Sequence, residues 1–385
     1  MNRIKILLAM VLVLAAAGAQ AADLTTQADE ALKALKAQIA PDGRQAIWNV
    51  TTIMQGDVLT VTGTVGYDEQ KQAIGQALAA KGISPVANNV VVLADAVPAG
   101  QRWAQIKLSV ATLRTSGRHA AEVATQGIMG MPLRVIEQGE EWWRVQCPDG
   151  YIAWIPTSSI VTKTDAQIQA WRSAARYIVT VYDSRLVTEP KGDETVSDLV
   201  MGNILTFKAK KGKWLQLATP DGREGWVPAA DVEEFKDWAK QDFDAKAIEK
   251  TARRMLGSGY LWGGTTTKIT DCSGLAKVSY FSNGIILRRD ASQQALTGQK
   301  IAGTDWQQCQ PMDLLFFGNS KTGRVTHVGL YLGEGKYIHC SGLVKINSLD
   351  PQDPTYLYSP LSCSRISTAL GTEGIEQVRN SKWYF

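Results

Sequence analysis

Histidine is scarce in this sequence, with three residues among 385. The chain also lacks an extended basic run, although its 41 Lys and Arg residues outnumber its 37 Asp and Glu residues. Because nucleic-acid grooves need clustered basic residues interleaved with aromatic ones, we expect no nucleic-acid partner. Any site that uses an imidazole must draw on His119, His327 and His339.

Cysteine is sparse as well, and its spacing lacks the close pairs typical of a zinc site. The five cysteines are Cys147, Cys272, Cys309, Cys340 and Cys363. Because five is an odd number, at least one thiol is expected to stay free, and a disulfide among the others is left open. We expect neither a metal nor another cofactor.

The N-terminus carries the one pronounced apolar run, in MNRIKILLAMVLVLAAAGAQAAD. Arg3 and Lys5 precede this run, which ends in the small-x-small sequence AQA that signal peptidase cleaves. The run is shorter than the about 20 apolar residues that a membrane-spanning helix needs. The sequence therefore predicts a signal peptide over residues 1–21 and export, to the periplasm or beyond, without a stable membrane anchor.

The composition, 45% apolar and 20% charged, allows more than one hydrophobic core in a chain of this length. Residues 24–100 are interpreted as a small α+β domain. Helical periodicity covers residues 28–39 and 68–82, and strand patterns cover residues 57–65 and 86–93.

An internal repeat follows this first domain. WWRVQCPDGYIAWIP, from Trp142, returns as KWLQLATPDGREGWVP, from Lys213. With an offset of 72 residues, Pro148, Gly150, Trp154 and Pro156 recur as Pro220, Gly222, Trp226 and Pro228, and Met129-Gly130 recurs as Met201-Gly202. Short alternating strands around a Pro-Asp-Gly turn predict two small antiparallel barrels, over residues 105–165 and 175–235. They resemble bacterial SH3-like (SH3b) domains.

The repeated tryptophans of these barrels have two interpretations. Aromatic side chains at period-two positions usually pack in a core, and we expect this of Trp143, Trp154, Trp214 and Trp226. A recess for a peptide or a glycan on one barrel is the alternative.

The last domain, residues 245–385, contains the stretch TDCSGLAKVSYF, from Thr270. The helical pattern after Asp271 places Cys272 at a helix N-terminus. Unpaired amides and the positive end of the helix dipole favour a thiolate there, so we predict a lowered thiol pKa and a nucleophilic role. A cysteine that only packs in the core would more naturally lie in mid-helix, on the apolar face.

Two of the three histidines follow this cysteine. His327 lies in RVTHVGLYLG and His339 in KYIHCSG, two strand patterns separated by the turn GEGK. A hairpin would place the two histidines on neighbouring strands. Taken alone, each histidine is more often structural; with Cys272 they predict a triad in which His327 is the base and His339 orients it.

The motifs DCSGL, DLLFFG, THVGLYLG and YIHCSG resemble those of the NlpC/P60 family of papain-like cysteine peptidases, over roughly residues 245–365. With the preceding domains, nearly the whole mature chain resembles the exported γ-D-glutamyl-L-diamino acid endopeptidases (dipeptidyl-peptidase VI-like). The resemblance implies a multidomain α+β fold: a small N-terminal α+β domain, two SH3-like β-barrels and a C-terminal papain-like domain. It also implies a substrate, peptidoglycan stem peptides with a free N-terminal L-Ala, cut between γ-D-Glu and the diamino acid.

The resemblance further implies site residues. Tyr260 would help the backbone amide of Cys272 hold the oxyanion. A substrate pocket would be formed by Asp271, Ser273, Trp262 and Ser292, closed at one end by Tyr151 and Glu122 of the first barrel. The simpler interpretations are that Asp271 caps the helix, that Ser273 is a first-turn residue and that Tyr151 lies on a strand surface. His119 is taken as structural, and Cys340 stands where a small residue is more usual.

Two other functions stay open. A broad endopeptidase could trim intact, crosslinked wall with the barrels as wall anchors. A catalytically silent protein could only grip stem peptides, although the complete triad argues against this hypothesis.

Overall fold

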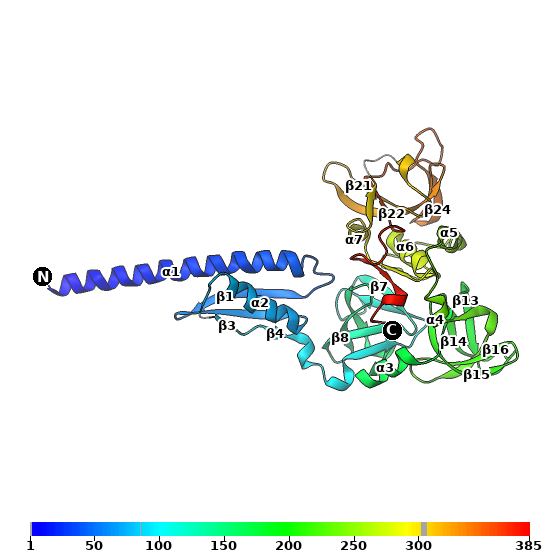
Figure 1. Cartoon of the computed structure of the whole chain (residues 1–385), viewed down its shortest axis with the longest axis horizontal. Helices are drawn as coiled ribbons and strands as arrows, with labels where there is room; N and C mark the ends of the chain where they lie inside the picture. Colours follow the sequence, from blue (N-terminus) through cyan, green and yellow to red (C-terminus); the bar gives the residue numbers. More distant parts are fainter. Residues whose placement is uncertain (1, 85, 302–305) are drawn as a thin grey trace. The chain divides into compact units, whose positions relative to one another are not determined.

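The computed structural model describes residues 2–84, 86–301 and 306–385, with side chains from residue 21 onward. The chain divides into two compact units, Met1–Pro98 and Ala99–Phe385 (Figure 1). The expected multidomain α+β fold is confirmed. Among the described residues, no helix combines the length and the apolar character needed to cross a membrane. The predicted signal peptide falls mostly where side chains lie outside the described part, and it stays a prediction.

The described residues of the first unit form an α+β domain of two helices and four strands. Its elements are α1 (Asn2–Ile39), β1 (Trp48–Gln55), β2 (Val58–Val65), α2 (Asp68–Ala80), β3 (Val86–Asn88), β4 (Val91–Val92) and the 3-10 turn η1 (Leu93–Ala96). Strand β2 pairs antiparallel with β1 and parallel with both β3 and β4. The predicted helix over residues 28–39 is confirmed within α1, and the strand pattern over residues 86–93 is divided between β3 and β4.

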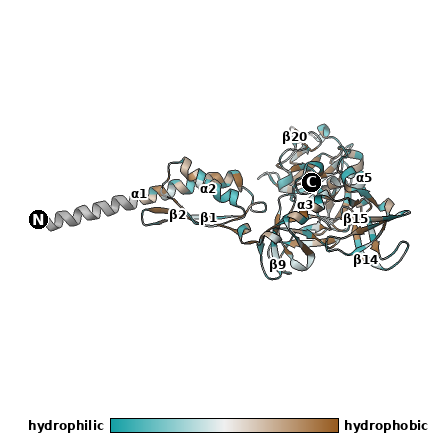
Figure 2. Cartoon of the chain, turned by 60° about the horizontal axis from the view of Figure 1, so that its bottom comes forward, coloured by the Kyte–Doolittle hydropathy of each residue, from teal (hydrophilic) through white to brown (hydrophobic). Residues whose placement is uncertain are grey.

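The core of this unit lies between its helices and its sheet. Ala28 and Leu32 of α1, and Ile74 and Leu78 of α2, are buried against apolar residues of β2 such as Val61. Spacings of four residues place these side chains on one face of each helix. Figure 2 accordingly shows both hydrophilic and hydrophobic residues along α2.

The second unit begins with two barrels of the same topology. The first contains β5 (Trp103–Ile106), β6 (Val110–Arg114), β7 (Val123–Ile128), β8 (Pro132–Gln138), β9 (Trp142–Gln146), β10 (Ile152–Pro156) and β11 (Ile160–Lys163). The second contains β12 (Arg176–Val179), β13 (Asp183–Val187), β14 (Thr195–Val200), β15 (Ile204–Lys211), β16 (Trp214–Ala218), β17 (Glu224–Pro228) and β18 (Val232–Glu234), after helix α3 (Asp165–Ser173). The strand order is β11-β5-β8-β9-β10-β6-β7 in the first sheet and β14-β13-β17-β16-β15-β12-β18 in the second. Read in the opposite direction, the second order passes through the strands equivalent to those of the first. The internal repeat is therefore structural.

The repeated tryptophans do not form the barrel cores, so that prediction is wrong. Trp154 and Trp226 are half-buried, between buried neighbours such as Ile155 and Val227. Since successive side chains of a strand point to opposite faces, the aliphatic residues fill the core and these tryptophans lie on the other face. There the guanidinium of Arg144 lies 5.9 Å from the ring centroid of Trp154.

The repeated Met-Gly pair marks the joints between domains. Gly130 has φ +83°, and a Cβ added there would lie 2.3 Å from the carbonyl oxygen of Ile204 in the second barrel. Gly202, its equivalent, has φ +90° and lies against Ile128 of the first barrel and Phe281 of the last domain. Each turn thus needs glycine both for its backbone conformation and for a close approach to a neighbouring domain.

The last domain packs helices against a six-stranded sheet. Its helices are α5 (Ala245–Arg254), α6 (Cys272–Phe281) and α7 (Ala291–Gln294), preceded by the short α4 (Phe235–Trp238). The sheet has the order β20-β25-β21-β22-β23-β24, formed by β20 (Gln299–Ile301), β25 (Ser362–Arg365), β21 (Leu314–Asn319), β22 (Arg324–Gly333), β23 (Lys336–Ser341) and β24 (Leu343–Ser348). A separate pair joins β19 (Ile285–Leu287) to β26 (Ile375–Gln377).

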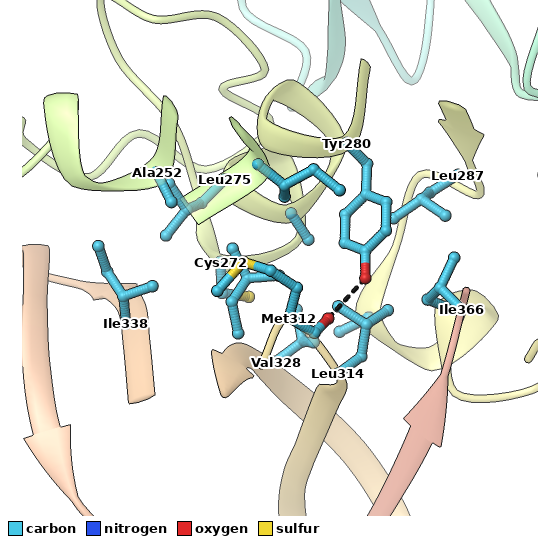
Figure 3. Close-up of a cluster of buried hydrophobic side chains, with 14 of the residues drawn as sticks. Ala252, Cys272, Leu275, Tyr280, Leu287, Met312, Leu314, Val328, Ile338 and Ile366 are labelled. Atoms are coloured by element: carbon cyan, nitrogen blue, oxygen red, sulfur yellow. Dashed lines mark hydrogen bonds between the residues drawn. The ribbon is translucent and has the colours of Figure 1, made fainter. Parts of the chain in front are cut away.

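Helix α6 carries the core of this domain. Leu275 and Tyr280 are buried with Leu314, Val328 and Ile338 of the sheet, and Cys272 lies in the same cluster (Figure 3). The hydroxyl of Tyr280 donates to the carbonyl of Met312, so the one polar atom of this ring is satisfied. The nucleophile candidate is therefore fixed on a well-packed helix.

An aromatic cluster joins the C-terminal segment to the barrels. Tyr384 is buried with Trp171 of α3, with Phe235 and Trp238 of α4, and with Ile286 of β19. The cluster spans elements from three parts of the second unit, so their arrangement depends on apolar burial.

We expect the Met-Gly joint to contribute measurably to stability. Gly130→Ala should lower the melting temperature more than Gly222→Ala does. Both glycines have positive φ, at +83° and +89°, but nothing lies within 4 Å of a Cβ added at Gly222. The control therefore carries only the strain of about 1–2 kcal/mol for a left-handed residue, and the clash at Gly130 adds about 1–3 kcal/mol. Equal shifts in thermal unfolding would contradict this account.

Candidate active site

Cys272 is the first residue of α6, as the sequence predicts. Asp271 is the N-cap, and its Oδ1 accepts a hydrogen bond from the amide of Gly274 at 2.7 Å. A Cβ at Gly274 would lie 2.0 Å from the carbonyl oxygen of Gly264. The start of the helix is therefore set by a carboxylate cap on one side and a close backbone approach on the other.

The predicted lowering of the thiol pKa is wrong. Burial and the negative charge of Asp271 raise the pKa of Cys272 to about 11. Hydrogen bonds from the backbone of Val328 and Ser273, and the charge of Arg289, act in the opposite direction but are weaker. The thiol is only 8% exposed, so the loss of hydration outweighs the favourable helix terminus. At neutral pH the resting nucleophile is a thiol.

His327 and His339 come together as the hairpin predicts. His327 lies on β22 and His339 on β23, and Nε2 of His327 is 2.6 Å from Nδ1 of His339. Gly329 faces this pair, and a Cβ added there would lie 3.3 Å from Cβ of His339. The backbone of Val328, the residue after His327, bonds to the thiol of Cys272, which places the nucleophile beside the same strand.

Both imidazoles are neutral at physiological pH. Burial, followed by the charge of His339, lowers the pKa of His327 to about 3. Burial also lowers the pKa of His339 to about 4, although its bond to Asn347 acts in the opposite direction. A neutral imidazole can act as a general base toward a neutral thiol, and the thiol of Cys272 is bonded to the backbone of Val328, the residue after His327.

Tyr260 lies in the loop before α6 and is half-buried. Its amide donates to the carbonyl of Gly342 at 3.0 Å, which fixes the loop against the sheet. Burial and then the charges of Cys272 and Asp271 raise the pKa of the Tyr260 hydroxyl well above its ordinary value. The hydroxyl therefore stays protonated and can donate a hydrogen bond near Cys272.

Asp271 and Ser273 are engaged within the protein. Arg289, buried to 1% exposure, donates from Nη2 to Oδ2 of Asp271 at 2.6 Å and from Nη1 to Oγ of Ser273 at 2.9 Å. The amide of Gly263 also donates to Oδ2 of Asp271, at 2.9 Å. The capping interpretation of Asp271 is confirmed. The role of Asp271 and Ser273 in binding a substrate amine stays a prediction.

The first barrel reaches the last domain along β7. The amide of Thr265 donates to Oε1 of Gln126 at 2.9 Å, and Nε of Arg289 donates to Oγ1 of Thr125 at 3.0 Å. Glu122, immediately before β7, is exposed, and Val123 beside it touches Gly263 of the loop that also holds Trp262. Glu122 and the 60% exposed Trp262 therefore border one region.

A second contact of this barrel involves Tyr151. Its hydroxyl donates to Oδ2 of Asp290 at 3.2 Å, so the strand-surface interpretation of Tyr151 is wrong. Asp290 precedes α7, which carries the half-buried Ser292. The pocket roles of Tyr151, Ser292, Trp262 and Glu122 stay predictions, since the structure contains no substrate.

Two charged residues of this region are absent from the predicted set, Arg289 and Asp290. Both stand in RRDASQQ, the segment that provides Ser292. Asp290 keeps 28% of its side chain exposed, whereas Arg289 is buried against Asp271. In the sequence, the adjacent arginine and aspartate near the predicted pocket residue Ser292 indicate charged groups at the pocket. The sequence alone does not indicate which of the two side chains faces solvent.

The remaining cysteines form no second nucleophilic site among the described residues. Cys147, Cys272 and Cys340 are free, which confirms the expected free thiol. Cys309 and Cys363 are paired in a disulfide, beside Asp313. Arg365 contacts this carboxylate at 2.9 Å, so the cluster suits a guanidinium and not a metal cation. Burial raises the pKa of Cys340 to about 12, which makes its thiol unreactive.

A cavity of about 430 Å³ lies among both barrels and the last domain, lined by residues such as Ile128, Met201 and Phe281. Neither Cys272 nor the two histidines line it. The cavity is a feature of the interdomain joint and not of the site described above.

Comparisons with known proteins agree with this architecture. The sequence profile of the NlpC/P60 family matches residues 257–361, and that of the bacterial dipeptidyl-peptidase Sh3 domain matches residues 113–160. Among solved structures, an NlpC/P60 family protein from Bacillus cereus superposes with a TM-score of 0.59 at 22% identity, covering 68% of this chain and 99% of that chain. At this identity the match concerns the fold alone.

Two relatives are similar in sequence. Dipeptidyl-peptidase 6 of Lysinibacillus sphaericus is 31% identical over 251 residues, 61% of this chain and 88% of the relative. Gamma-D-glutamyl-L-lysine dipeptidyl-peptidase of Bacillus cereus is 24% identical over 233 residues, 57% of this chain and 68% of the relative. Both alignments are long enough to include more than the NlpC/P60 region.

The resting protonation state can be measured directly. In a difference titration of ultraviolet absorbance between the wild type and Cys272→Ser, we expect the thiolate signal only at alkaline pH, with a midpoint of about 11. The reason is that burial disfavours the charged form. The tyrosines and the other free thiol remote from Cys272 cancel, whereas Tyr260 and Cys340, whose pKa values depend on the charge of Cys272, titrate at higher pH than Cys272. A thiolate signal at pH 7 that disappears on acidification would show a preformed ion pair instead.

Proposed function

Because the chain belongs to the NlpC/P60 family and is a cysteine peptidase, we propose that it hydrolyses the γ-D-glutamyl-L-diamino acid bond of peptidoglycan stem peptides with a free N-terminal L-Ala. The observation that carries this proposal is that Cys272 starts α6 and is bonded to the backbone of Val328, the residue after His327, whose imidazole pairs with His339. The name of the Bacillus cereus relative supports the choice of bond. The role would be turnover or recycling of wall peptides.

The proposed reaction starts from neutral groups. Cys272 attacks the γ-glutamyl carbonyl while His327 takes the thiol proton. The amide of Cys272 and the hydroxyl of Tyr260 donate to the oxyanion. The imidazolium of His327 then gives its proton to the leaving amine of the diamino acid. Water attacks the resulting thioester, with His327 again as base, and releases L-Ala-γ-D-Glu and the free thiol.

Recognition of the substrate amine is assigned to the contact between the first barrel and the last domain. Asp290 is the partly exposed carboxylate there, held by the hydroxyl of Tyr151 at 3.2 Å. The buried charge of Arg289 is already balanced by Asp271. Asp290 lies farther from this guanidinium, with its Oδ1 3.9 Å from Nη1 of Arg289, and an ammonium group at its exposed side would add a second cation to the carboxylate.

A cleavage assay tests this proposal against the wall-trimming alternative. We expect L-Ala-γ-D-Glu-diaminopimelate to be cleaved, and its N-acetylated form to lose about 10²-fold or more in kcat/KM, because a site built for a polar group rejects a ligand without it. Asp290→Asn should narrow this difference, whereas Asp242→Asn, at a 91% exposed carboxylate, should not.

The same assay contains its controls. Cys272→Ala should abolish cleavage, and its retention on purified sacculi would measure binding without chemistry. A thiol alkylator should inactivate the wild type and EDTA should not. Equal cleavage of both peptides would favour an enzyme that trims intact wall, and EDTA-sensitive activity would contradict the cysteine mechanism.

We further propose that the protein acts outside the cytoplasm, on the strength of the N-terminal sequence. When the full chain is expressed in a Gram-negative host, the protein recovered from the periplasmic fraction should begin at Ala22. N-terminal sequencing would check the cleavage site. Retention of Met1 on a cytoplasmic product would contradict export and would leave the catalytic proposal unchanged.

A further inference from the structure

The histidine pair continues into a third polar side chain that the mechanism above does not use. Asn347 lies on β24, is 9% exposed, and its Oδ1 is 2.8 Å from Nε2 of His339. Its Nδ2 donates to the backbone carbonyl of Thr355. A connected row therefore runs from Thr355 through Asn347 and His339 to His327.

The chemistry of each group fixes the direction of every hydrogen bond in this row. The carbonyl of Thr355 can only accept, so the amide nitrogen of Asn347 must face it and the amide oxygen must face His339. That oxygen also only accepts, so Nε2 of His339 carries the hydrogen and Nδ1 of this neutral ring accepts. His327 must therefore donate from Nε2, and its lone pair lies on Nδ1.

The carbonyl at the far end of the row is itself held in place. The amide and the hydroxyl of Thr355 donate to Oδ1 of Asp353, at 2.7 and 2.6 Å. Asp353 forms an ion pair with Lys336, which lies on β23, the strand that carries His339. The orientation of the Asn347 amide is thus set by the sheet and by the turn after β24.

We propose that Asn347 is a positioning residue that sets the tautomers of both histidines and makes Nδ1 of His327 the basic nitrogen of the reaction. Without Asn347, His339 can carry its hydrogen on Nδ1 instead. That hydrogen would then point at the hydrogen on Nε2 of His327, and the bond between the two rings would require His327 to change tautomer as well. The expected effect on kcat rests on the proposed function. The tautomers do not, because they are a property of the protein without substrate.

Nitrogen-15 NMR of histidine-labelled protein tests the tautomers directly, and three histidines give a simple spectrum. At pH 7 we expect both His327 and His339 to be neutral with hydrogen on Nε2. Asn347→Leu should move His339 to the other tautomer or to a mixture. Asn319→Leu, the same change at an exposed side chain at the end of β21, should leave both signals in place. A wild-type His339 with hydrogen on Nδ1 would overturn the proposal.

Kinetics give the second readout. Asn347→Leu should lower kcat by about 10²-fold or more with little change in KM, because the wrong tautomer of a catalytic histidine is costly. Asn347→Asp keeps the acceptor and adds a negative charge, so it should retain more activity and move the acid limb of the pH profile to higher pH. Unchanged kcat in a folded Asn347→Leu protein would overturn the proposal. Failure of the wild type to cleave the stem peptide would instead contradict the proposed function and leave the NMR result standing.

Discussion

The site depends on one buried ion pair, between Arg289 and Asp271. The guanidinium is 1% exposed and binds both carboxylate oxygens, while the same carboxylate caps the helix that begins with Cys272. Arg289 also donates to Thr125 of the first barrel, and the amide of Gly263, in the loop before α6, donates to Asp271. The start of α6, this loop and the contact with the first barrel therefore all depend on this one ion pair. Removing one member of such a pair typically costs about 3–5 kcal/mol, because the other charge stays buried and unpaired. The geometry around the nucleophile therefore depends on a contact between domains.

Local patterns in the sequence predict the elements but not this pair. A capping aspartate before an apolar helix and two strand patterns joined by a tight turn are short-range signals, and they locate Cys272, His327 and His339 correctly on their elements. Arg289 lies beyond the end of α6, and only the packing of that helix returns it to Asp271. The prediction of a lowered pKa for the Cys272 thiol is wrong for the same reason. The helix terminus is visible in the sequence, whereas burial and the facing charge, which decide the direction, are tertiary properties.

The tandem barrels illustrate what duplication provides. Their strands are equivalent, yet the repeated turns face different neighbours. In the first barrel Asp149 pairs with Lys277 of α6 at 2.8 Å. In the second, Asp221 pairs with Arg223, whose Nη2 donates to the carbonyl of Lys107 in the first barrel at 2.8 Å. The repeated Pro-Asp-Gly turn thus contacts the catalytic domain in the first copy and the first barrel in the second copy, although the second barrel reaches the catalytic domain elsewhere, for example through Asp198 and Lys268 at 3.1 Å. The 72-residue offset could not indicate this difference.

The resting protonation states have a consequence for an enzyme proposed to work outside the cytoplasm. With the pKa of Cys272 raised to about 11 and that of His327 lowered to about 3, spontaneous proton transfer between them is strongly unfavourable. A neutral thiol oxidises more slowly than a thiolate, so burial protects the nucleophile between turnovers. Proton transfer then becomes favourable only together with bond formation to a carbonyl, when negative charge moves from sulfur to an oxyanion that has its own donors. The same burial that makes Cys272 a poor free nucleophile thus couples its activation to a correctly placed substrate.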